Sequence, residues 1–283
     1  MMLKNKTIII TGGSLGIGLA IAKKCAIEGA RVIIASRNKY DLEDALNELN
    51  QIAPNNHKSY SLDVSILEDV QKFGDWIRNV VGNVSGLVNC AGIYGPIGKS
   101  TTIDLLEFKK AIEINFLGTV YMCSTIAPLM RSETNKKIIN ISGGGAATPF
   151  ANYSAYATSK IALVRFTENL SIELKEDQFD INCVAPGFVI TRLHENTLKA
   201  GHDVAGEKFY KATAEQVEKG GVSPEVAADL TAFLLSVDSD DITGKFLSAP
   251  WDPWRNIEFQ ELLRSDLDFA TLRRIDNKQY FKK

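Results

Sequence analysis

Lys6-Thr7-Ile8-Ile9-Ile10-Thr11 leads directly into Gly12-Gly13-Ser14-Leu15-Gly16-Ile17-Gly18, and this stretch decides the fold of the chain. A short apolar run without alternation is typical of a strand that is covered on both faces. A helical pattern over 16–28 follows the glycines. Glycines let the backbone turn tightly and approach a pyrophosphate, whose charge the helix N-terminus meets. The glycines alone are also consistent with a tight strand-to-helix turn that binds nothing, although their position directly after a buried first strand favours phosphate binding.

The rest of the chain repeats this order of strand and helix. Further strands are expected at 31–35, 59–62, 86–89, 137–142, 180–185 and 245–248. Further helices are expected at 40–50, 67–80, 104–130, 154–175 and 225–235. Alternation with short connections predicts one α/β domain with a doubly wound parallel sheet.

Composition narrows the class of protein. The chain has 283 residues and a formal net charge of -2, so we expect no nucleic-acid or membrane partner. No apolar run approaches the ~20 residues of a membrane span. The cysteines lack Cys-x-x-Cys spacing and fall in apolar segments, as buried free thiols of a reducing compartment do: Cys25, Cys90, Cys123 and Cys183. We therefore expect a cytoplasmic protein, and the scattered His and Cys residues predict no metal site.

Tyr156 and Lys160 lie one helical turn apart at the start of the 154–175 pattern. A phenol has a pKa near 10 in water, which makes it a poor general acid or base at neutral pH. An ammonium on the same helix face stabilises the phenolate, and the helix N-terminus, with Asn152 and Ser154 as candidate caps, adds positive potential. The pair is therefore a candidate for proton transfer, although this spacing also arises by chance in many proteins.

Several motifs support this interpretation together: Thr11-Gly12-x3-Gly16-Ile17-Gly18, Asp63-Val64, Asn89-Cys90-Ala91-Gly92, Asn115, Tyr156-x3-Lys160, and Pro186-Gly187 with Thr191. They occur in the order found in the short-chain dehydrogenase/reductase family, which the chain resembles over roughly residues 5–248. The resemblance implies a single-domain Rossmann fold, with a seven-stranded parallel sheet and helices on both faces. It also implies a nicotinamide cofactor, a small-molecule substrate, and hydride transfer between a carbonyl and an alcohol.

The resemblance assigns the catalytic residues. Tyr156 would be the general acid or base, and Lys160 would hold the nicotinamide ribose and lower the pKa of the phenol. Asn115 would link Lys160 to solvent through a water molecule. Asn115 also falls inside the helical run 111–121, where Asn is a mediocre helix former. A residue that breaks a local rule without evident gain is independently a candidate functional residue.

The resemblance also implies the cofactor contacts. The Asp63 carboxylate and the Val64 backbone would bind adenine, and the Val189 backbone with the Thr191 hydroxyl would bind the nicotinamide carboxamide. The remaining implied contacts are Gly12, Ser14, Gly16, Ile17, Gly18, Asn89, Ala91, Gly92, Tyr156, Lys160, Pro186 and Gly187.

Cofactor preference can be argued from the end of the second strand. An acidic residue at this place binds the ribose 2′-hydroxyl of NAD, but this chain has Ser36 and Arg37. A guanidinium binds a phosphate through two hydrogen bonds, and a hydroxyl can donate to it. The sequence therefore favours NADP(H). NAD(H) remains the alternative, because Arg37 could instead form a surface ion pair and Leu15 places no basic residue in the glycine turn.

One position departs from the family. Its catalytic Ser lies thirteen residues before the Tyr, where this chain has Gly143. Ser142 precedes it, and a shift of one residue reverses the face of a strand. We include Ser142 as the fourth catalytic candidate, since the following glycines could let its hydroxyl reach the substrate. Otherwise a substrate hydroxyl or the N–H groups of the glycine run would polarise the carbonyl.

Two other functions compete with the dehydrogenase interpretation. Gly12-x-Ser14-x-Gly16 matches the nucleophile elbow of serine hydrolases, which also need a histidine base, and the candidates are His57, His194 and His202. The other alternative is a cofactor-binding sensor or scaffold that has lost turnover, as the glycine at 143 suggests.

Two segments interrupt the pattern. We expect residues 1–250 to form the cofactor-binding domain, with a substrate lid at about 192–222, because connections of this length commonly serve binding. Residues 251–283 would pack on this domain or on a partner subunit. Trp251 and Trp254, beside prolines, could instead stack on a cyclic substrate.

Association is suggested by an apolar stripe on the 154–175 pattern, formed by Leu163, Phe166, Leu170 and Leu174. In the family, this helix and the 104–130 helix pair across a two-fold axis. The resemblance thus implies a homodimer or homotetramer, although such a stripe suits the core of the protein nearly as well.

Overall fold

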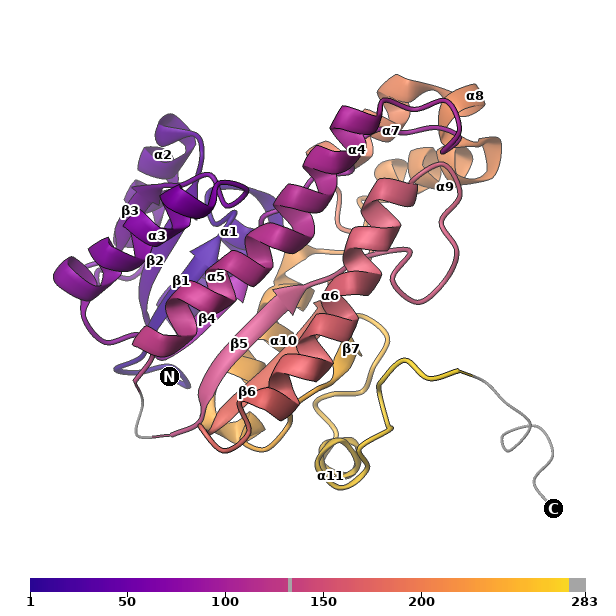
Figure 1. Cartoon of the computed structure of the whole chain (residues 1–283). Coiled ribbons are helices and arrows are strands. Elements are labelled where there is room, and N and C mark those ends of the chain that lie inside the picture. Colours follow the sequence, from indigo (N-terminus) through magenta and orange to yellow (C-terminus); the bar gives the residue numbers. More distant parts are fainter. Residues whose placement is uncertain (132–133, 275–283) are drawn as a thin grey trace, which may run out of the picture.

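A computed structural model describes residues 1–131 and 134–274 of the chain (Figure 1). Seven parallel strands form one sheet in the order β3-β2-β1-β4-β5-β6-β7. The strands are β1 (Thr7–Thr11), β2 (Arg31–Ser36), β3 (Lys58–Ser61), β4 (Gly86–Asn89), β5 (Lys136–Ile141), β6 (Phe179–Ala185) and β7 (Phe246–Ser248). The seven-stranded Rossmann sheet implied by the family resemblance is confirmed.

Helices cover both faces of the sheet. The α-helices in the described residues are α1 (Gly16–Ile27), α2 (Lys39–Ile52), α3 (Leu67–Trp76), α4 (Leu105–Ile112), α5 (Gly118–Ile126), α6 (Ser154–Glu173), α7 (Arg192–Ala200), α8 (His202–Ala205), α9 (Glu207–Glu218), α10 (Pro224–Leu235) and α11 (Ile257–Ser265). Short 3-10 turns occupy Ala127–Leu129 and Val237–Ser239.

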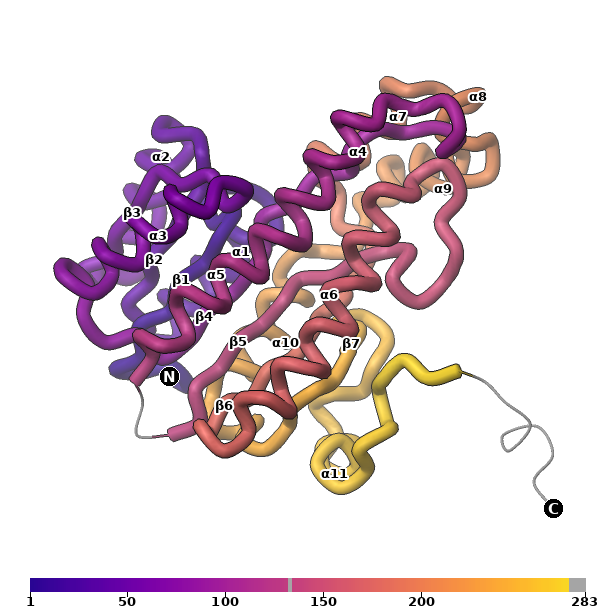
Figure 2. Tube along the Cα trace, viewed as in Figure 1, coloured from indigo at the N-terminus to yellow at the C-terminus, as the bar shows by residue number. Residues whose placement is uncertain are grey.

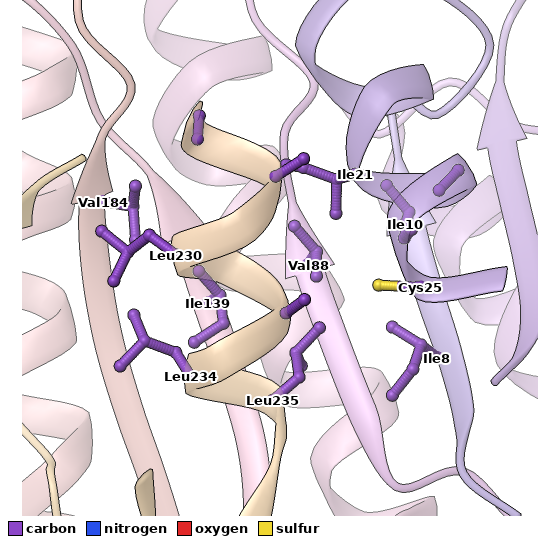
Figure 3. Packing of buried hydrophobic residues seen from close by; sticks show 14 of the residues in the cluster. Ile8, Ile10, Ile21, Cys25, Val88, Ile139, Val184, Leu230, Leu234 and Leu235 are labelled. Atoms are coloured by element: carbon purple, nitrogen blue, oxygen red, sulfur yellow. The ribbon is translucent and has the colours of Figure 1, made fainter. Parts of the chain in front are cut away.

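The apolar strands are buried on both sides, as their lack of alternation predicts. Ile8 and Ile10 point toward the layer that contains α1 and α10, and Ile9 points toward the layer that contains α3 and α5. All three isoleucines have no exposed surface. In Figure 3, Leu230 and Leu234 of α10 lie over the sheet, next to Val184 of β6 and Ile139 of β5.

The expected helix 104–130 is one run of changing geometry. Between α4 and α5 it contains a π-helical turn, Glu113–Leu117, and a second π turn, Ile77–Val81, follows α3. Within the described chain, only Leu105–Leu129 has the length and mean hydropathy (1.2) of a membrane span. It packs on α3 and α6, which is the setting of a core helix in a layered domain.

Residues 192–222, the segment expected to be a substrate lid and called the lid below, are largely helical. The lid holds α7, α8 and α9, which gather beyond the start of α4 in Figure 2. Thr191 caps α7 by accepting a hydrogen bond from Leu193 N at 3.4 Å. α7 and α9 are polar overall, so no long apolar run marks them in the sequence.

The C-terminal extension packs on its own domain. Trp254 is buried, stacks on Phe233 at 5.5 Å and joins the core below α10. This position contradicts the hypothesis that Trp254 stacks on a substrate, whereas Trp251 is 80% exposed. Residues 275–283 of the predicted extension lie outside the described residues.

The end of the described chain covers the free edge of β7. Phe246 N donates to the carbonyl of Ala270 at 2.8 Å. The buried Lys245 ammonium donates to three backbone carbonyls of the same segment: Asp266, Leu267 and Phe269.

The apolar stripe of α6 serves the core. Leu163 is buried, and Phe166, Leu170 and Leu174 pack against the cluster on the α3 and α5 side of the sheet. The chain itself therefore covers the stripe in part, since Phe166, Leu170 and Leu174 are only half-buried.

Candidate active site

A cavity of about 890 Å³ lies where the carboxyl ends of the first four strands meet the lid. Such a crevice is where doubly wound sheets bind ligands. The predicted cofactor residues that line it are Gly12, Ser14, Gly16, Ile17, Gly18, Ser36, Arg37, Asp63, Val64, Ala91, Gly92 and Thr191. The sequence motifs therefore converge on one site.

The glycine turn fits a pyrophosphate. Gly12 has a φ of +64°, and a Cβ at Gly18 would collide with the carbonyl of Gly12. At the N-terminus of α1, Leu15 gives no side-chain cap and the first turn has no acidic residue. The free N–H groups of the first turn of α1 are therefore not covered by a capping side chain. They face the cavity together with the positive end of the helix dipole.

The end of β2 carries a free cation. Ser14 Oγ donates to Ser36 Oγ at 2.9 Å, which joins the glycine turn to this strand end. The Arg37 guanidinium is exposed, and it has neither an ion pair nor a hydrogen bond within residues 1–131 and 134–274. Nearby, the Asp41 carboxylate faces Arg192 Nη1 across the cavity at 3.9 Å.

The wall of the cavity beyond the end of β3 combines apolar surface with one carboxylate, as the binding of a flat apolar ring with one polar edge requires. Leu62 and Ile114 supply apolar surface. Asp63 accepts from the Ser65 backbone N–H at 3.0 Å and from its hydroxyl at 2.6 Å, so the carboxylate is held in one orientation. This arrangement suits an adenine amino group.

Asn89, which was expected among the cofactor contacts, does not line the cavity. It is 3% exposed and donates to Asn140 Oδ1 at 2.9 Å, which ties β4 to β5. Above it, Thr11 Oγ1 accepts from the backbone N–H groups of Cys90 and Ala91. Thr11, which was not expected among the site residues, thus fixes the loop whose residues Ala91 and Gly92 line the cavity.

The expected nicotinamide residues separate into two groups. Thr191 lines the cavity and lies close to the glycine turn, since a Cβ at Gly16 would be 3.5 Å from its methyl group. Pro186, Gly187 and Val189 do not line it. Gly187 has a φ of +84° and packs on Pro250.

Lys160 and Asn115 meet directly behind Gly92. Lys160 Nζ donates to the Ile141 carbonyl at 2.8 Å. Asn115 is fully buried in the π turn, a feature that is frequent at functional sites, and its amide binds both backbone groups of Ile93 at 2.8 Å. A Cβ on Gly92 would lie 3.2 Å from Asn115 Oδ1 and 3.4 Å from Lys160 Nζ.

Tyr156 lies beside this pair but does not line the cavity. Its side chain is 7% exposed, and its ring centroid is 5.6 Å from Lys160 Nζ. Burial raises the pKa of the phenol, the Cys90 thiol adds to the rise, and burial lowers the pKa of Lys160. In the chain alone, desolvation therefore outweighs any lowering of the phenol pKa by Lys160, and that lowering stays a prediction.

The expected caps of α6 are also wrong. The N-cap position is Tyr153, which provides no side-chain cap. Asn152 has a φ of +66°, and Ser154 is already the first helical residue, where its hydroxyl accepts from Ser100 at 2.7 Å.

Comparisons with known proteins agree with this geometry. A sequence model of the family described as short chain dehydrogenase matches residues 6–201. The chain belongs to the short-chain dehydrogenase/reductase family. Hydride transfer by a nicotinamide cofactor is general in this family, so the chain is a short-chain dehydrogenase/reductase-type oxidoreductase.

Relatives of this short-chain dehydrogenase/reductase align along most of its length. The uncharacterized oxidoreductase YxbG of Bacillus subtilis is 31% identical over 248 residues, covering 87% of this chain and 90% of the relative. Levodione reductase of Leifsonia aquatica is 29% identical over 240 residues, covering 83% and 89%.

Solved structures of the family have the same fold. A levodione reductase structure has a TM-score of 0.79 at 25% identity and covers 89% of this chain and 98% of its own. An NAD⁺-bound xylitol dehydrogenase has a TM-score of 0.80 at 24% identity, covering 88% and 98%.

Against this short-chain dehydrogenase/reductase background, Gly143 is the main departure. A Cβ at Gly143 would collide with the Tyr156 hydroxyl, so the phenol occupies the space that a side chain would fill. Ser142 does not replace the missing hydroxyl: it is 2% exposed and donates to the Lys160 carbonyl at 3.3 Å. The structure thus does not bring Ser142 to Tyr156.

Sequence reasoning missed an aromatic cluster around Tyr156. Tyr94 packs edge-to-face on Tyr156 at 4.9 Å, and Phe150 lies 6.5 Å from it. The cluster also contains Tyr153, just before α6, and Phe209 of α9 in the lid. The only signal in the sequence is the position of Tyr94, two residues after Gly92.

The hydrolase alternative has no supporting geometry. Ser14 donates to Ser36, and no described histidine is bonded to it. His57 accepts from Val32 N at 2.9 Å, and His194 lies in the lid against Phe188.

Proposed function

We propose that this short-chain dehydrogenase/reductase transfers hydride between NADP(H) and the carbon of a carbonyl or alcohol. The observation that carries the cofactor preference is the unpaired Arg37 guanidinium at the rim of the cavity. A free guanidinium beside the Ser36 hydroxyl suits a ribose 2′-phosphate. The surface ion pair that would have explained Arg37 otherwise is absent from the described residues.

The residues of the catalytic end support carbonyl reduction. A bound reduced nicotinamide would supply hydride, with its two electrons, to the carbonyl carbon. Tyr156 would then give its hydroxyl proton to the carbonyl oxygen, which takes the electron pair of the broken π bond. Burial raises the pKa of Tyr156, so the phenol is protonated at neutral pH and ready to act as the acid. Lys160 would orient the ribose, and Asn115 holds the Ile93 backbone beside it.

A sensor or scaffold without turnover is the second candidate. Gly143 removes the usual hydroxyl, and Tyr156 stands outside the lining of the cavity. Single-turnover hydride transfer from NADPH to any carbonyl compound, lost in Tyr156→Phe, would exclude this candidate.

Binding of the two cofactors tests the proposal. Arg37→Ala should weaken NADPH binding by about 10- to 100-fold, because a charged hydrogen-bond donor contributes about 1.5–3 kcal/mol, and should leave NADH unchanged. Lys39→Ala is the matched control, since it removes an exposed cation two residues away and outside the cavity lining. Equal affinities of the wild-type chain for NADPH and NADH would refute the preference.

We also propose a cytoplasmic protein that assembles as a homodimer or homotetramer. Cys25, Cys90, Cys123 and Cys183 are all free thiols, which suits a reducing compartment. Exposed apolar side chains near the family's pairing helices, Leu105, Leu106 and Ile172, support association. Light scattering on the purified chain measures its mass in solution, and a monomer would refute the assembly.

A further inference from the structure

We propose that Tyr94 is a second catalytic residue, whose hydroxyl donates a hydrogen bond to the carbonyl oxygen of the substrate in place of the hydroxyl that Gly143 lacks. This inference rests on the proposed hydride transfer. The neighbouring hydroxyls are already engaged within the chain. Ser142 donates to the Lys160 carbonyl at 3.3 Å, and Tyr153 donates to Thr197 at 2.9 Å.

The position of Tyr94 fits this role. Gly92 and Ile93, which line the cavity, precede it directly. The Tyr94 ring meets the Tyr156 ring at 86° with centroids 4.9 Å apart, and it meets Tyr153 at 71° and 5.2 Å. Like Tyr156, Tyr94 does not itself line the cavity. The two phenols belong to one packed cluster that begins next to the lining residue Ile93, where the reacting carbonyl would lie.

The Tyr94 hydroxyl is available. Neither this hydroxyl nor that of Tyr156 has a hydrogen-bond partner in residues 1–131 and 134–274. In the same part of the chain, the fully buried side-chain atoms without a hydrogen-bond partner are Asn89 Oδ1, Thr213 Oγ1 and Asp240 Oδ1, the last of which forms an ion pair with Lys137. Both phenolic oxygens therefore retain accessible surface. A largely buried hydroxyl that keeps some accessible surface and has no partner within the described chain is free to donate to a bound substrate.

The backbone of Tyr94 is held rigidly. Asn115 binds both the N–H and the C=O of Ile93, immediately before it. Gly95 follows with a φ of +71°, and a Cβ there would lie only 2.6 Å from the Ala111 side chain. A donor that is fixed before the substrate arrives costs no reorganisation during the reaction. On this account Asn115 is also a positioning residue for Tyr94.

The protonation state is suitable. Burial raises the pKa of Tyr94, and the phenols of Tyr156 and Tyr153 add to the rise. Tyr94 is therefore a neutral donor at any working pH. During reduction it keeps its proton while Tyr156 gives one to the oxygen, so the two phenols have separate roles.

The test is kinetic, with Tyr153→Phe as a matched control. Wild type, Tyr94→Phe, Tyr153→Phe and Tyr156→Phe would be mixed with NADPH and a panel of cyclic ketones, aromatic aldehydes and 9,10-phenanthrenequinone. Tyr94→Phe should lower kcat by about 10²–10³-fold with little change in KM, as the loss of an oxyanion donor does. Tyr153→Phe removes a hydroxyl that is committed to Thr197, so its kcat should stay within about threefold.

Two further measurements separate chemistry from structure. The NADPH dissociation constant, from quenching of protein fluorescence, and the melting temperature should both be unchanged in Tyr94→Phe, because the lost hydroxyl has no partner in the described part of the chain. A normal kcat in Tyr94→Phe, or equal losses in Tyr94→Phe and Tyr153→Phe, would overturn the role of Tyr94 alone. A wild-type chain that reduces no member of the panel would overturn the proposed function as well.

Discussion

The two ends of the cavity are built in different ways. The glycine-turn end is formed by short contiguous segments, such as Gly12–Gly18 and Ser36-Arg37, whose backbone follows directly from the sequence. The catalytic end brings Tyr94 together with Tyr156 and Lys160 of α6, which lie more than sixty residues further along the chain, and side-chain packing sets their orientation. The contrast teaches that motifs predict where a backbone turns better than where a side chain points.

The largest expected effect is a loss of catalysis without a loss of cofactor binding. Tyr156→Phe should lower kcat by about 10²–10⁴-fold, because it removes the proton that the carbonyl oxygen must receive. NADPH binding should persist, since Tyr156 does not line the cavity. Stopped-flow absorbance measures the first quantity and fluorescence titration the second. Loss of both together would mean that the two ends are not separable.

Acid should weaken the lid at the catalytic end. Burial lowers the pKa of His194 to about 4, against about 6.5 in an unfolded chain. Between these values the unfolded chain binds a proton that the folded chain does not. The free energy of unfolding should therefore fall by up to about 3 kcal/mol as the pH drops from 6.5 to 4.

Urea titrations at pH 7 and 4.5 measure this dependence. His194→Phe should flatten it, and His202→Gln, which changes an exposed histidine of the same lid, should not. A wild-type profile that is already flat in this range would count against a buried neutral His194.

Gly143 and Gly144 offer a matched pair for the packing at Tyr156. Gly143→Ala would push a methyl group into the phenol hydroxyl and should cost about 1–3 kcal/mol of stability. At Gly144 the nearest atom to a Cβ is Phe150 Cε1 at 4.0 Å, so Gly144→Ala should be far milder. Thermal unfolding compares them, and equal losses would show that Tyr156 can move aside freely.

The smallest effect is expected at the β2 end. Asp41 faces Arg192 in an exposed pair worth about 0–1 kcal/mol. Asp41→Asn should remove a negative charge near the proposed phosphate site and tighten NADPH binding by a few-fold, with NADH unaffected. Isothermal titration calorimetry resolves this change. Tightening of both cofactors alike would place Asp41 away from the 2′-phosphate.

The sequence predicted the sheet almost completely. Continuous apolar runs such as Ile8–Ile10 mark central strands, and every expected strand is present within one or two residues of its expected bounds. The helices α7, α8, α9 and α11 were not predicted, because they are short and polar and depend on tertiary contacts for stability.

In the site, the backbone-defined contacts were predicted and the side-chain roles less so. The glycine turn and Thr191 line the cavity, as predicted. Asn115, predicted to be functional because Asn is a poor helix former, lies in the π turn. Ser142, the caps at Asn152 and Ser154, and the phenol pKa depend on orientation and desolvation, which a linear motif does not encode. Tyr94 belongs to no motif, so only its packing reveals it.

The segment that follows α11 has a consequence for solubility. The outer edge of a terminal strand is a template on which a strand from another molecule can add. Here Phe246 N is already satisfied by Ala270, and Lys245 fastens that segment in place. A chain cut after Ser265 would lose the segment that covers β7, and the exposed edge of this strand could then pair with strands of other molecules and form fibrils.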